Sequence, residues 1–319
     1  MPRNIIAVTL NSSVDVIIDL PRFVGNSVLD ADSYMDIAAG KGINVARALA
    51  ALGEHPLAVG IVGKESKPIF SMVASRNIHT DFVYADGPSR RNTTIIQKKS
   101  GAITHIRSEG YTVNNSILSR VKRKLQTSIR KNDIVVFCGS LPKGTNADLY
   151  AECIELCNAK KASAILDTAG TPLRNAVAAN PRMVKCNRQE FQTTFGLPPQ
   201  CDDGALIHQM KKLIRSGISS VAVTLGPGGV IVLDKNEERI VKAHIDLGAE
   251  YTGRKVVGSG DALLAGFIVG MKKNFLCGET VRWGIACGAA NMFSKIPGDI
   301  DKQQVKRLLK MVHCEFISV

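Results

Sequence analysis

Residues 258–270 read Gly-Ser-Gly-Asp-Ala-Leu-Leu-Ala-Gly-Phe-Ile-Val-Gly, a glycine-rich turn followed at once by small and apolar residues. The first N–H groups of a helix have no acceptor within the helix, and the helix dipole places partial positive charge at that end. A glycine turn that opens a helix therefore predicts a site for a phosphate or another anion. We expect Gly258, Ser259 and Gly260 to form this site.

Asp261 stands at the mouth of the turn, where a carboxylate would repel a resting phosphate. A substrate hydroxyl between the two groups would remove this conflict. Asp261 would then orient and deprotonate the hydroxyl, while the amides of residues 258–260 receive the phosphoryl group that it attacks. We expect the helix start to lower the pKa of Asp261. The alternative is a tight strand-to-helix turn in which Asp261 is only an N-cap.

A second glycine turn opens another small-residue helix within residues 38–53, which read Ala-Ala-Gly-Lys-Gly-Ile-Asn-Val-Ala-Arg-Ala-Leu-Ala-Ala-Leu-Gly. Neither turn completes Gly-x-Gly-x-x-Gly, because Val45 and Leu263 occupy the last position. The chain also contains no Gly-x-x-x-x-Gly-Lys-[Ser/Thr]. These absences disfavour a nicotinamide dehydrogenase and a Walker-type ATPase.

Short β-branched segments alternate with helical segments along most of the chain. The expected strands are 5–10, 57–62, 134–138, 164–166, 221–225 and 230–233, and the expected helices include 146–160, 204–216 and 261–273. This alternation predicts an α/β fold, a Rossmann-like and mostly parallel sheet with helices on both faces. Residues 13–35 and 88–109 show little helical pattern, and we expect them to form strands outside this sheet.

The composition fits one large α/β domain, because 45% of the 319 residues are hydrophobic. No apolar run reaches the about 18 residues that a membrane helix needs, and no signal-peptide pattern precedes the first strand. We therefore expect a cytoplasmic protein without a membrane partner. Eight scattered cysteines without a Cys-x-x-Cys pair are typical of reduced packing residues.

The formal net charge of +13 raises the question of nucleic-acid binding. The densest basic cluster lies within residues 120–131, where apolar residues recur at helical spacing. This pattern predicts one amphipathic helix with a basic face. No aromatic residue interleaves with the cluster, so no base-stacking surface accompanies the charge, and we expect no nucleic-acid partner.

Both glycine segments resemble signatures of the ribokinase and PfkB family of ATP-dependent sugar kinases, which read Gly-Gly-Lys-Gly-x-Asn-x-Ala and Gly-Ala-Gly-Asp. Further segments follow in the family's order, at residues 9–15, 139–144, 166–170, 185–190 and 224–229. Ala39 and Ser259 depart from the pattern without removing a backbone donor. The chain most resembles the branch of tagatose-6-phosphate kinase and 1-phosphofructokinase.

The resemblance implies a ribokinase-like core with a small β lid that closes over the sugar and pairs two subunits as a homodimer. The core would comprise residues 1–12, 36–87 and 110–319, and the lid residues 13–35 and 88–109. The implied reaction uses ATP and Mg²⁺ to phosphorylate a ketohexose monophosphate, which would be tagatose 6-phosphate, fructose 1-phosphate or fructose 6-phosphate. The alternatives are a kinase of a free sugar or nucleoside, and a non-catalytic nucleic-acid or regulatory binding protein.

The resemblance also assigns site residues. Those on the sugar side are Asp15, Gly40, Lys41, Asn44 and Arg91, with Arg90 as a substitute for Arg91 because adjacent arginines leave the register open. Those on the nucleotide side are Lys185, Asn187, Glu190, Thr224, Gly226, Gly229 and Asn291. Of these, Glu190 would hold Mg²⁺ through water.

Overall fold

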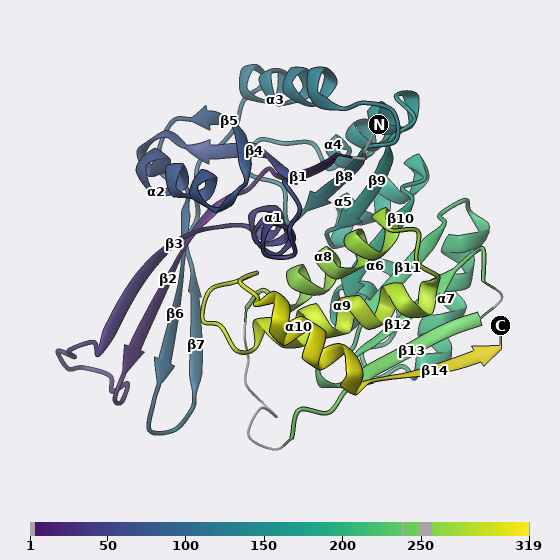
Figure 1. Ribbon diagram of the computed structural model, residues 1–319. Coiled ribbons are helices and arrows are strands. Elements are labelled where there is room, and N and C mark those ends of the chain that lie inside the picture. Colours follow the sequence, from purple (N-terminus) through teal and green to yellow (C-terminus); the bar gives the residue numbers. More distant parts are fainter. Residues whose placement is uncertain (1–3, 238, 249–256, 319) are drawn as a thin grey trace.

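The computed structural model describes residues 4–237, 239–248 and 257–318, which form two sheets (Figure 1). The larger sheet has ten strands in the order β14-β13-β12-β11-β10-β9-β8-β1-β4-β5. In chain order these are β1 (Ile5–Thr9), β4 (Leu57–Gly63), β5 (His79–Ala85), β8 (Ile134–Cys138), β9 (Ser163–Asp167), β10 (Met183–Asn187), β11 (Ser220–Thr224), β12 (Val230–Asp234), β13 (Arg239–Ile245) and β14 (Val312–Ser318).

The seven strands from β5 to β11 are parallel, and β12, β13 and β14 continue the sheet in antiparallel pairing. Strands β1 and β8 are apolar at nearly every position and buried throughout, as expected where helices cover both faces. The prediction of an α/β fold with a mostly parallel sheet is confirmed.

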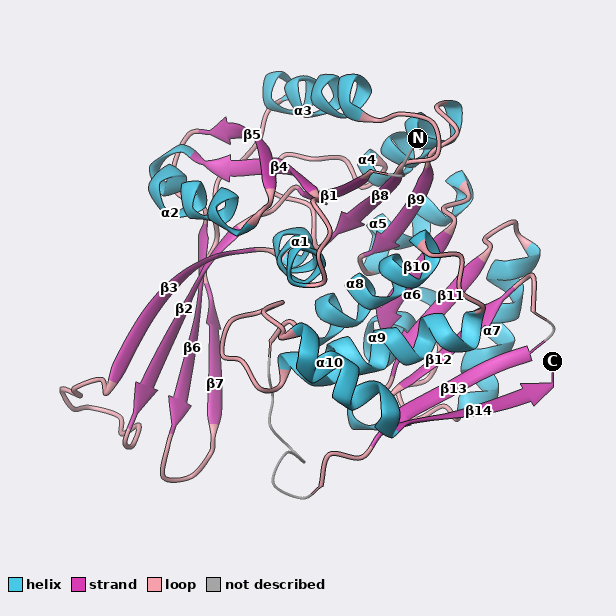
Figure 2. Cartoon of the chain, viewed as in Figure 1, coloured by secondary structure: helices cyan, strands magenta, loops and turns pink. Residues whose placement is uncertain are grey.

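Helices cover both faces of the large sheet (Figure 2). One apolar cluster joins one face to α3 (Asn115–Ser128), α4 (Leu149–Ala159), α5 (Gly170–Ala176), α6 (Arg188–Phe195) and α7 (Asp203–Arg215). A second cluster joins the other face to α1 (Lys41–Ala51), α8 (Ser259–Lys272), α9 (Cys277–Asn291) and α10 (Lys302–Leu308). The remaining helical segments are α2 (Lys67–Ser71) and the 3₁₀ turns Lys64–Ser66, Met72–Arg76, Val177–Ala179, Gly226–Gly228 and Leu309–Met311.

The smaller sheet has four strands in the order β3-β2-β6-β7 and extends away from the rest of the molecule (Figure 1). These strands are β2 (Ser13–Leu20), β3 (Ser33–Ala39), β6 (Arg90–Gln97) and β7 (Ile103–Arg107). Val14, Val16 and Ala38 anchor one end of this sheet in a third apolar cluster that includes Ile43 of α1. We call the smaller sheet and its connections the lid. The division of the chain into a core domain and a lid domain stays a prediction.

The register of the lid separates its polar side chains onto two faces. β2 and β6 run parallel, with Val14 beside Arg91 and Asp15 beside Asn92. Because successive side chains of a strand point to opposite faces, Asp15 and Asn92 share one face and Arg91 lies on the other. Arg90, which is next to Arg91 in the chain, lies on the face of Asp15.

The eight cysteines are all free, and most are buried in apolar surroundings. Their burial fits the packing role expected of them, and their reduced state stays a prediction. Within the part of the chain that the structure describes, no helix is long and apolar enough to cross a membrane.

Candidate active site

Two glycine turns place the starts of α1 and α8 at the same edge of the large sheet, beyond the carboxyl ends of its parallel strands. Gly40 precedes α1 with a φ of 129°, and Gly258 precedes α8 with a φ of 97°. Other residues rarely adopt such angles. The carboxyl edge of a parallel sheet is where α/β proteins usually bind ligands.

Glycine also permits the backbones at this edge to approach one another. A Cβ on Gly42 would lie 2.6 Å from the carbonyl oxygen of Val8, and one on Gly298 would lie 2.2 Å from that of Asn44. A Cβ on Gly258 would lie 2.7 Å from the Gly298 nitrogen. The start of α1, the start of α8 and the segment after α9 therefore meet without intervening side chains.

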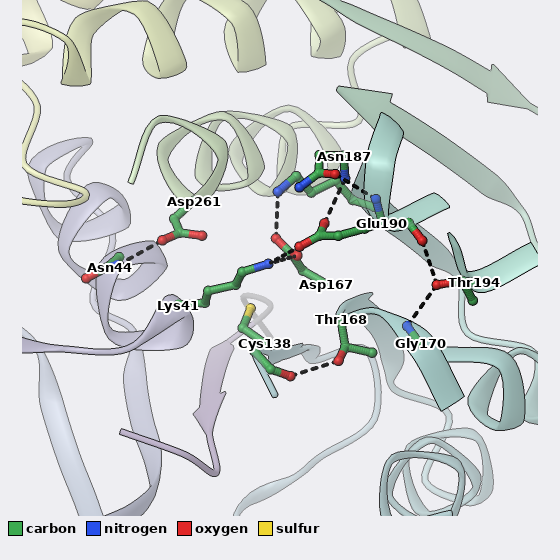
Figure 3. A network of polar contacts seen from close by, with 12 residues as sticks. Lys41, Asn44, Cys138, Asp167, Thr168, Gly170, Asn187, Glu190, Thr194 and Asp261 are labelled. Atoms are coloured by element: carbon green, nitrogen blue, oxygen red, sulfur yellow. Dashed lines mark hydrogen bonds and ion pairs between the residues drawn. The ribbon is translucent and has the colours of Figure 1, made fainter. Parts of the chain in front are cut away.

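The side chain of Asp261 lies at the centre of this meeting point. Its Oδ2 accepts a hydrogen bond of 2.8 Å from Nδ2 of Asn44, which connects α8 to α1 (Figure 3). Asn44 Oδ1 in turn accepts a bond of 3.2 Å from Arg47. Both Asp261 and Asn44 are buried. Asn44, itself held by Arg47, thus fixes the orientation of the Asp261 carboxylate.

The pKa of Asp261 is raised to about 6, mainly by burial and secondly by the negative charge of Asp167. Lys41, Lys185 and the hydrogen bond from Asn44 act in the opposite direction. The prediction that the helix start lowers this pKa was therefore wrong. The loss of solvation outweighs the partial charge of the helix end.

Asp167, at the carboxyl end of β9, binds two lysines at once. Its Oδ1 lies 2.8 Å from Nζ of Lys41 and its Oδ2 lies 2.7 Å from Nζ of Lys185. Burial acts to raise the pKa of Asp167, but the two ammonium groups outweigh this effect and lower it. One buried carboxylate therefore keeps two positive charges close to each other.

Lys185 lies directly over the start of α8, because a Cβ on Gly260 would be 3.0 Å from its Nζ. The helix ladder begins with the bond from the Ala262 N–H to the Gly258 carbonyl. The N–H groups of Ser259 and Gly260 precede this bond, in the turn where helical amides have no intrahelical acceptor. The two ammonium groups and the helix start favour an anion here, although the carboxylates of Asp167, Glu190 and Asp261 offset part of their charge.

Asn187 and Glu190 form a capping box at the start of α6. Asn187 Oδ1 accepts from the Glu190 N–H at 2.8 Å, and Glu190 Oε2 accepts from the Asn187 N–H at 2.9 Å. The other Glu190 oxygen, Oε1, lies 3.6 Å from Nζ of Lys41. One carboxylate oxygen of Glu190 therefore faces the lysine–aspartate cluster (Figure 3).

The other nucleotide-side residues lie at two places. Thr224 ends β11 directly beside Asn187, and Gly226 and Gly229 form the turn that follows it. Asn291, at the end of α9, is fully buried and donates 3.0 Å bonds to two backbone carbonyls of the next segment. Its Oδ1 has no partner among the described residues.

The lid carries the remaining candidates. Asp15 Oδ1 accepts bonds from Ser13 at 2.8 Å and from Asn92 at 2.9 Å. Arg90 donates from Nη2 to the Asn11 carbonyl at 3.4 Å, and its buried Nε has no partner within the described part of the chain.

Arg91 points the other way. Its partners are Asp36, at 2.8 Å, and Tyr34, at 3.0 Å, and all three side chains are at least partly exposed. One group of site residues therefore lies around Asp261 and Asp167, and another lies on the Asp15 face of the lid. Arg91 belongs to neither.

Sequence reasoning assigned no role to Asp167, although it singled out the segment 166–170. An acidic residue that ends an apolar strand and precedes a Thr-Ala-Gly turn was the available signal. Arg107 was also missed. It pairs with Asn92 in the β6–β7 register and so shares the face of Asp15 and Arg90.

A sequence model described as pfkB family carbohydrate kinase matches residues 8–300. The 1-phosphofructokinase of Bacillus subtilis (strain 168) is 30% identical over 309 residues, which are 97% of this chain and 98% of the relative. A tagatose-6-phosphate kinase of Staphylococcus epidermidis is 27% identical over 311 residues, which are 97% of this chain and 98% of that relative.

Solved structures share the fold. The tetrameric inhibited form of phosphofructokinase-2 from Escherichia coli has a TM-score of 0.87 at 24% identity, covering 97% of this chain and 99% of its own. The same Escherichia coli protein in complex with fructose-6-phosphate has a TM-score of 0.86 at 23% identity, again covering 97% of this chain and 99% of its own.

Proposed function

The chain belongs to the pfkB family of carbohydrate kinases, and we propose that it transfers the terminal phosphoryl group of ATP to a hydroxyl of a ketohexose monophosphate, giving a bisphosphate and ADP. The relatives named 1-phosphofructokinase and tagatose-6-phosphate kinase support this substrate class. A cytoplasmic location is also part of the proposal.

The observation that carries the proposal is the position of Asp261 in the first turn of α8, close to the charges of Lys41 and Lys185. Asn44 holds the Asp261 carboxylate through its Oδ2. The orientation of the other oxygen, Oδ1, is therefore fixed, and this oxygen can accept a hydrogen bond from a substrate hydroxyl. It takes the hydroxyl proton as the hydroxyl oxygen attacks phosphorus. A pKa of about 6 leaves Asp261 ionised at neutral pH and basic enough to hold that proton.

The charge of the moving phosphoryl group is met by Lys185 and by the N–H groups of Ser259 and Gly260. In phosphoryl transfer most of the catalysis comes from positioning and from such electrostatic stabilisation. Asp167 holds Lys41 and Lys185 in place while neutralising only part of their charge. The chain therefore supplies both a base and an anion site within one cluster.

Glu190 is the residue proposed to hold Mg²⁺ through water. Among the described residues, no group of three His, Cys, Asp or Glu side chains could hold a metal ion. Mg²⁺ keeps several waters and usually takes one or two protein carboxylates together with substrate phosphates, and Glu190 presents one carboxylate oxygen, Oε1, toward the cluster of Lys41 and Asp167. When bound, Mg²⁺ supplies positive charge to the phosphate oxygens of ATP.

The phosphate already on the sugar is proposed to bind Arg90 and Arg107. Both arginines lie on the same face of the lid as Asp15. On that face Asp15 can accept hydrogen bonds from the sugar hydroxyls while the arginines bind the phosphate of the same sugar. The buried Nε of Arg90 has no partner in the described ranges, and an arginine fork binds phosphate well. Arg91 is already paired with Asp36 on the opposite face.

A homodimer through the lid is also part of the proposal. The lid exposes several large apolar side chains, namely Phe23, Val24, Val28, Tyr34, Met35 and Ile106. Apolar exposure of this kind is typical of a protein–protein contact.

The test of the proposed function is ADP release, measured with ATP and Mg²⁺ against a panel of acceptors. We expect saturable release with one or more of tagatose 6-phosphate, fructose 1-phosphate and fructose 6-phosphate, and little with free sugars or nucleosides. Equal activity on free sugars would favour the first alternative. ATP turnover that depends on nucleic acid and ignores every sugar would favour the second.

A further inference from the structure

The lid is attached to the core at a second place, far along the chain from its apolar anchor. Nζ of Lys295 forms an ion pair with Oδ2 of Asp19, and the two residues are 276 positions apart. Lys295 follows α9, whereas Asp19 is near the far end of β2. At about 3.3 Å per residue, Asp19 lies about 20 Å along the strand from its first residue, Ser13.

The two partners differ in exposure. The side chain of Asp19 is only 3% exposed, whereas that of Lys295 is 57% exposed. Asp19 also accepts a 2.7 Å bond from Ser33 of β3. Burial acts to raise the pKa of Asp19, but the contacts with Lys295 and Ser33 outweigh it and lower the pKa. Removing the lysine would therefore leave a buried carboxylate without its hydrogen-bonded counter-charge, with the charge of Lys98 as the remaining compensation, which is costly.

The segment that carries Lys295 is firmly held by the core. Asn291 donates to the carbonyls of Ile296 and Asp299, each at 3.0 Å. Ser294 accepts a bond of 3.1 Å from the Ile296 N–H. Lys295 thus projects from a segment whose backbone is fixed on both sides of it.

The same segment is connected to Asp261 through Arg47 and Asn44. Arg47 donates to the Pro297 carbonyl and also to Oδ1 of Asn44, the residue that holds Asp261. Asp15 and Asp19 share one face of β2, because they are an even number of residues apart on a strand. The ion pair therefore joins the sugar-side face of the lid to the segment that supports Asn44.

We propose that Lys295 is a positioning residue, which holds the lid over the bound sugar phosphate through its ion pair with Asp19. This proposal rests on the proposed function. It gives a role to a residue that lies outside the proposed substrate and ATP sites. Closing a lid excludes water and completes the contacts to substrate. A weaker attachment would therefore reduce binding of the sugar more than the chemical step.

The test compares Lys295→Met, Asp19→Asn and the double variant in two measurements. Hydrogen exchange of the β2 and β6 amides reports attachment of the lid without any need for activity. We expect faster exchange in each variant, and a KM for the sugar phosphate raised about fivefold to tenfold, as an ion pair with one exposed partner allows. We expect kcat to change by less than about threefold, because chemistry at Asp261 is untouched.

Three comparisons decide the result. The double variant should be no worse than the single ones if the two side chains act together. Lys295→Arg should restore both measurements. Lys122→Met is the matched control, because Lys122 pairs with Glu152 between α3 and α4 and not with the lid, and it should behave like the unmodified protein.

Unchanged exchange and unchanged KM in Lys295→Met would overturn the proposal, and so would additive effects in the double variant. If no sugar phosphate is turned over by the unmodified protein, the proposed function fails instead. The exchange measurement still decides in that case whether the lid is held by Lys295.

Discussion

Among the individual residues, Asp261 illustrates a conflict between stability and a proposed catalytic role. Burial raises its pKa from 3.8 to about 6, so the folded protein holds this proton more tightly than the unfolded chain does. The stability that the protonated form contributes is fully present below about pH 4 and is lost as the pH rises through about 6. Above that pH a buried charge opposes folding.

Asp261→Asn should therefore stabilise the fold at neutral pH. The raised pKa predicts an increase of about 1–3 kcal/mol in the free energy of unfolding near neutral pH, and much less at about pH 4. Asparagine keeps an oxygen that can accept the bond from Asn44. Urea unfolding at both pH values measures the effect, and an equal change at the two values would contradict the pKa assignment.

Arg90 and Arg91 provide a second test on single side chains, because adjacent residues of one strand face opposite sides. Arg90→Gln should raise the KM for the sugar phosphate by about tenfold to a hundredfold, since a charged hydrogen bond to phosphate is lost. Arg91→Gln is the matched control and should change KM by less than about twofold, because its partner Asp36 lies on the other face. The reverse order of effects would contradict the proposed phosphate site.

Among the helices and strands, α8 and α9 pack with almost no space between their backbones. A Cβ on Gly266 would lie 2.6 Å from the Trp283 carbonyl oxygen, and one on Gly284 would lie 2.2 Å from the ring of Phe267. Because α8 begins at the turn of Gly258 and α9 ends at Asn291, this contact fixes both sides of the candidate site.

Gly266→Ala should separate the two helices and destabilise the protein by about 1–3 kcal/mol, as overpacking does in a dense core. Gly25→Ala is the control, because nothing lies within 4 Å of the added carbon, and it should be near neutral. Thermal unfolding of both variants provides the measurement. Equal melting temperatures would show that the helix pair tolerates the extra methyl group.

The strands also show how far sequence reasoning could go. Strands β1, β4, β8, β9, β11 and β12 are short β-branched runs, and their predicted bounds differ from the observed ones by at most a residue at each end. Strands β5, β13 and β14 were missed, since they mix polar and apolar residues at or near the edges of the sheet. Strand β10 contains a buried Lys185, and only the pairing with Asp167 makes that burial possible.

The site was predicted unevenly for a related reason. Glycine turns mark Gly40, Gly258 and their neighbours directly, because the backbone there needs glycine. The face on which Arg90 or Arg91 lies depends on strand register, and the pKa of Asp261 depends on burial and on Asp167. Neither the face of a strand residue nor the pKa of a buried carboxylate can be read from the residues next to it in the sequence.

In the molecule as a whole, the lid is expected to join two copies of the chain. Ile106 is 53% exposed on the lid face away from Asp15. Ile106→Asp should shift the sedimentation of the protein from dimer to monomer, because a charge would be buried in the contact. Leu276→Asp is the control, since Leu276 is 78% exposed immediately before α9, and it should leave the dimer intact. A monomeric unmodified protein would contradict the proposed dimer.

The proposed site divides two tasks, because Asp261 is proposed to aim and deprotonate the attacking hydroxyl while other residues are proposed to bind ATP. The kcat of Asp261→Asn with the preferred sugar phosphate, measured together with the Kd for ATP, separates these tasks. We expect kcat to fall by about 10²–10⁴-fold, the usual contribution of a positioned base, with ATP affinity changed by less than about threefold. Near-normal turnover in this variant would show that Asp261 is not the base.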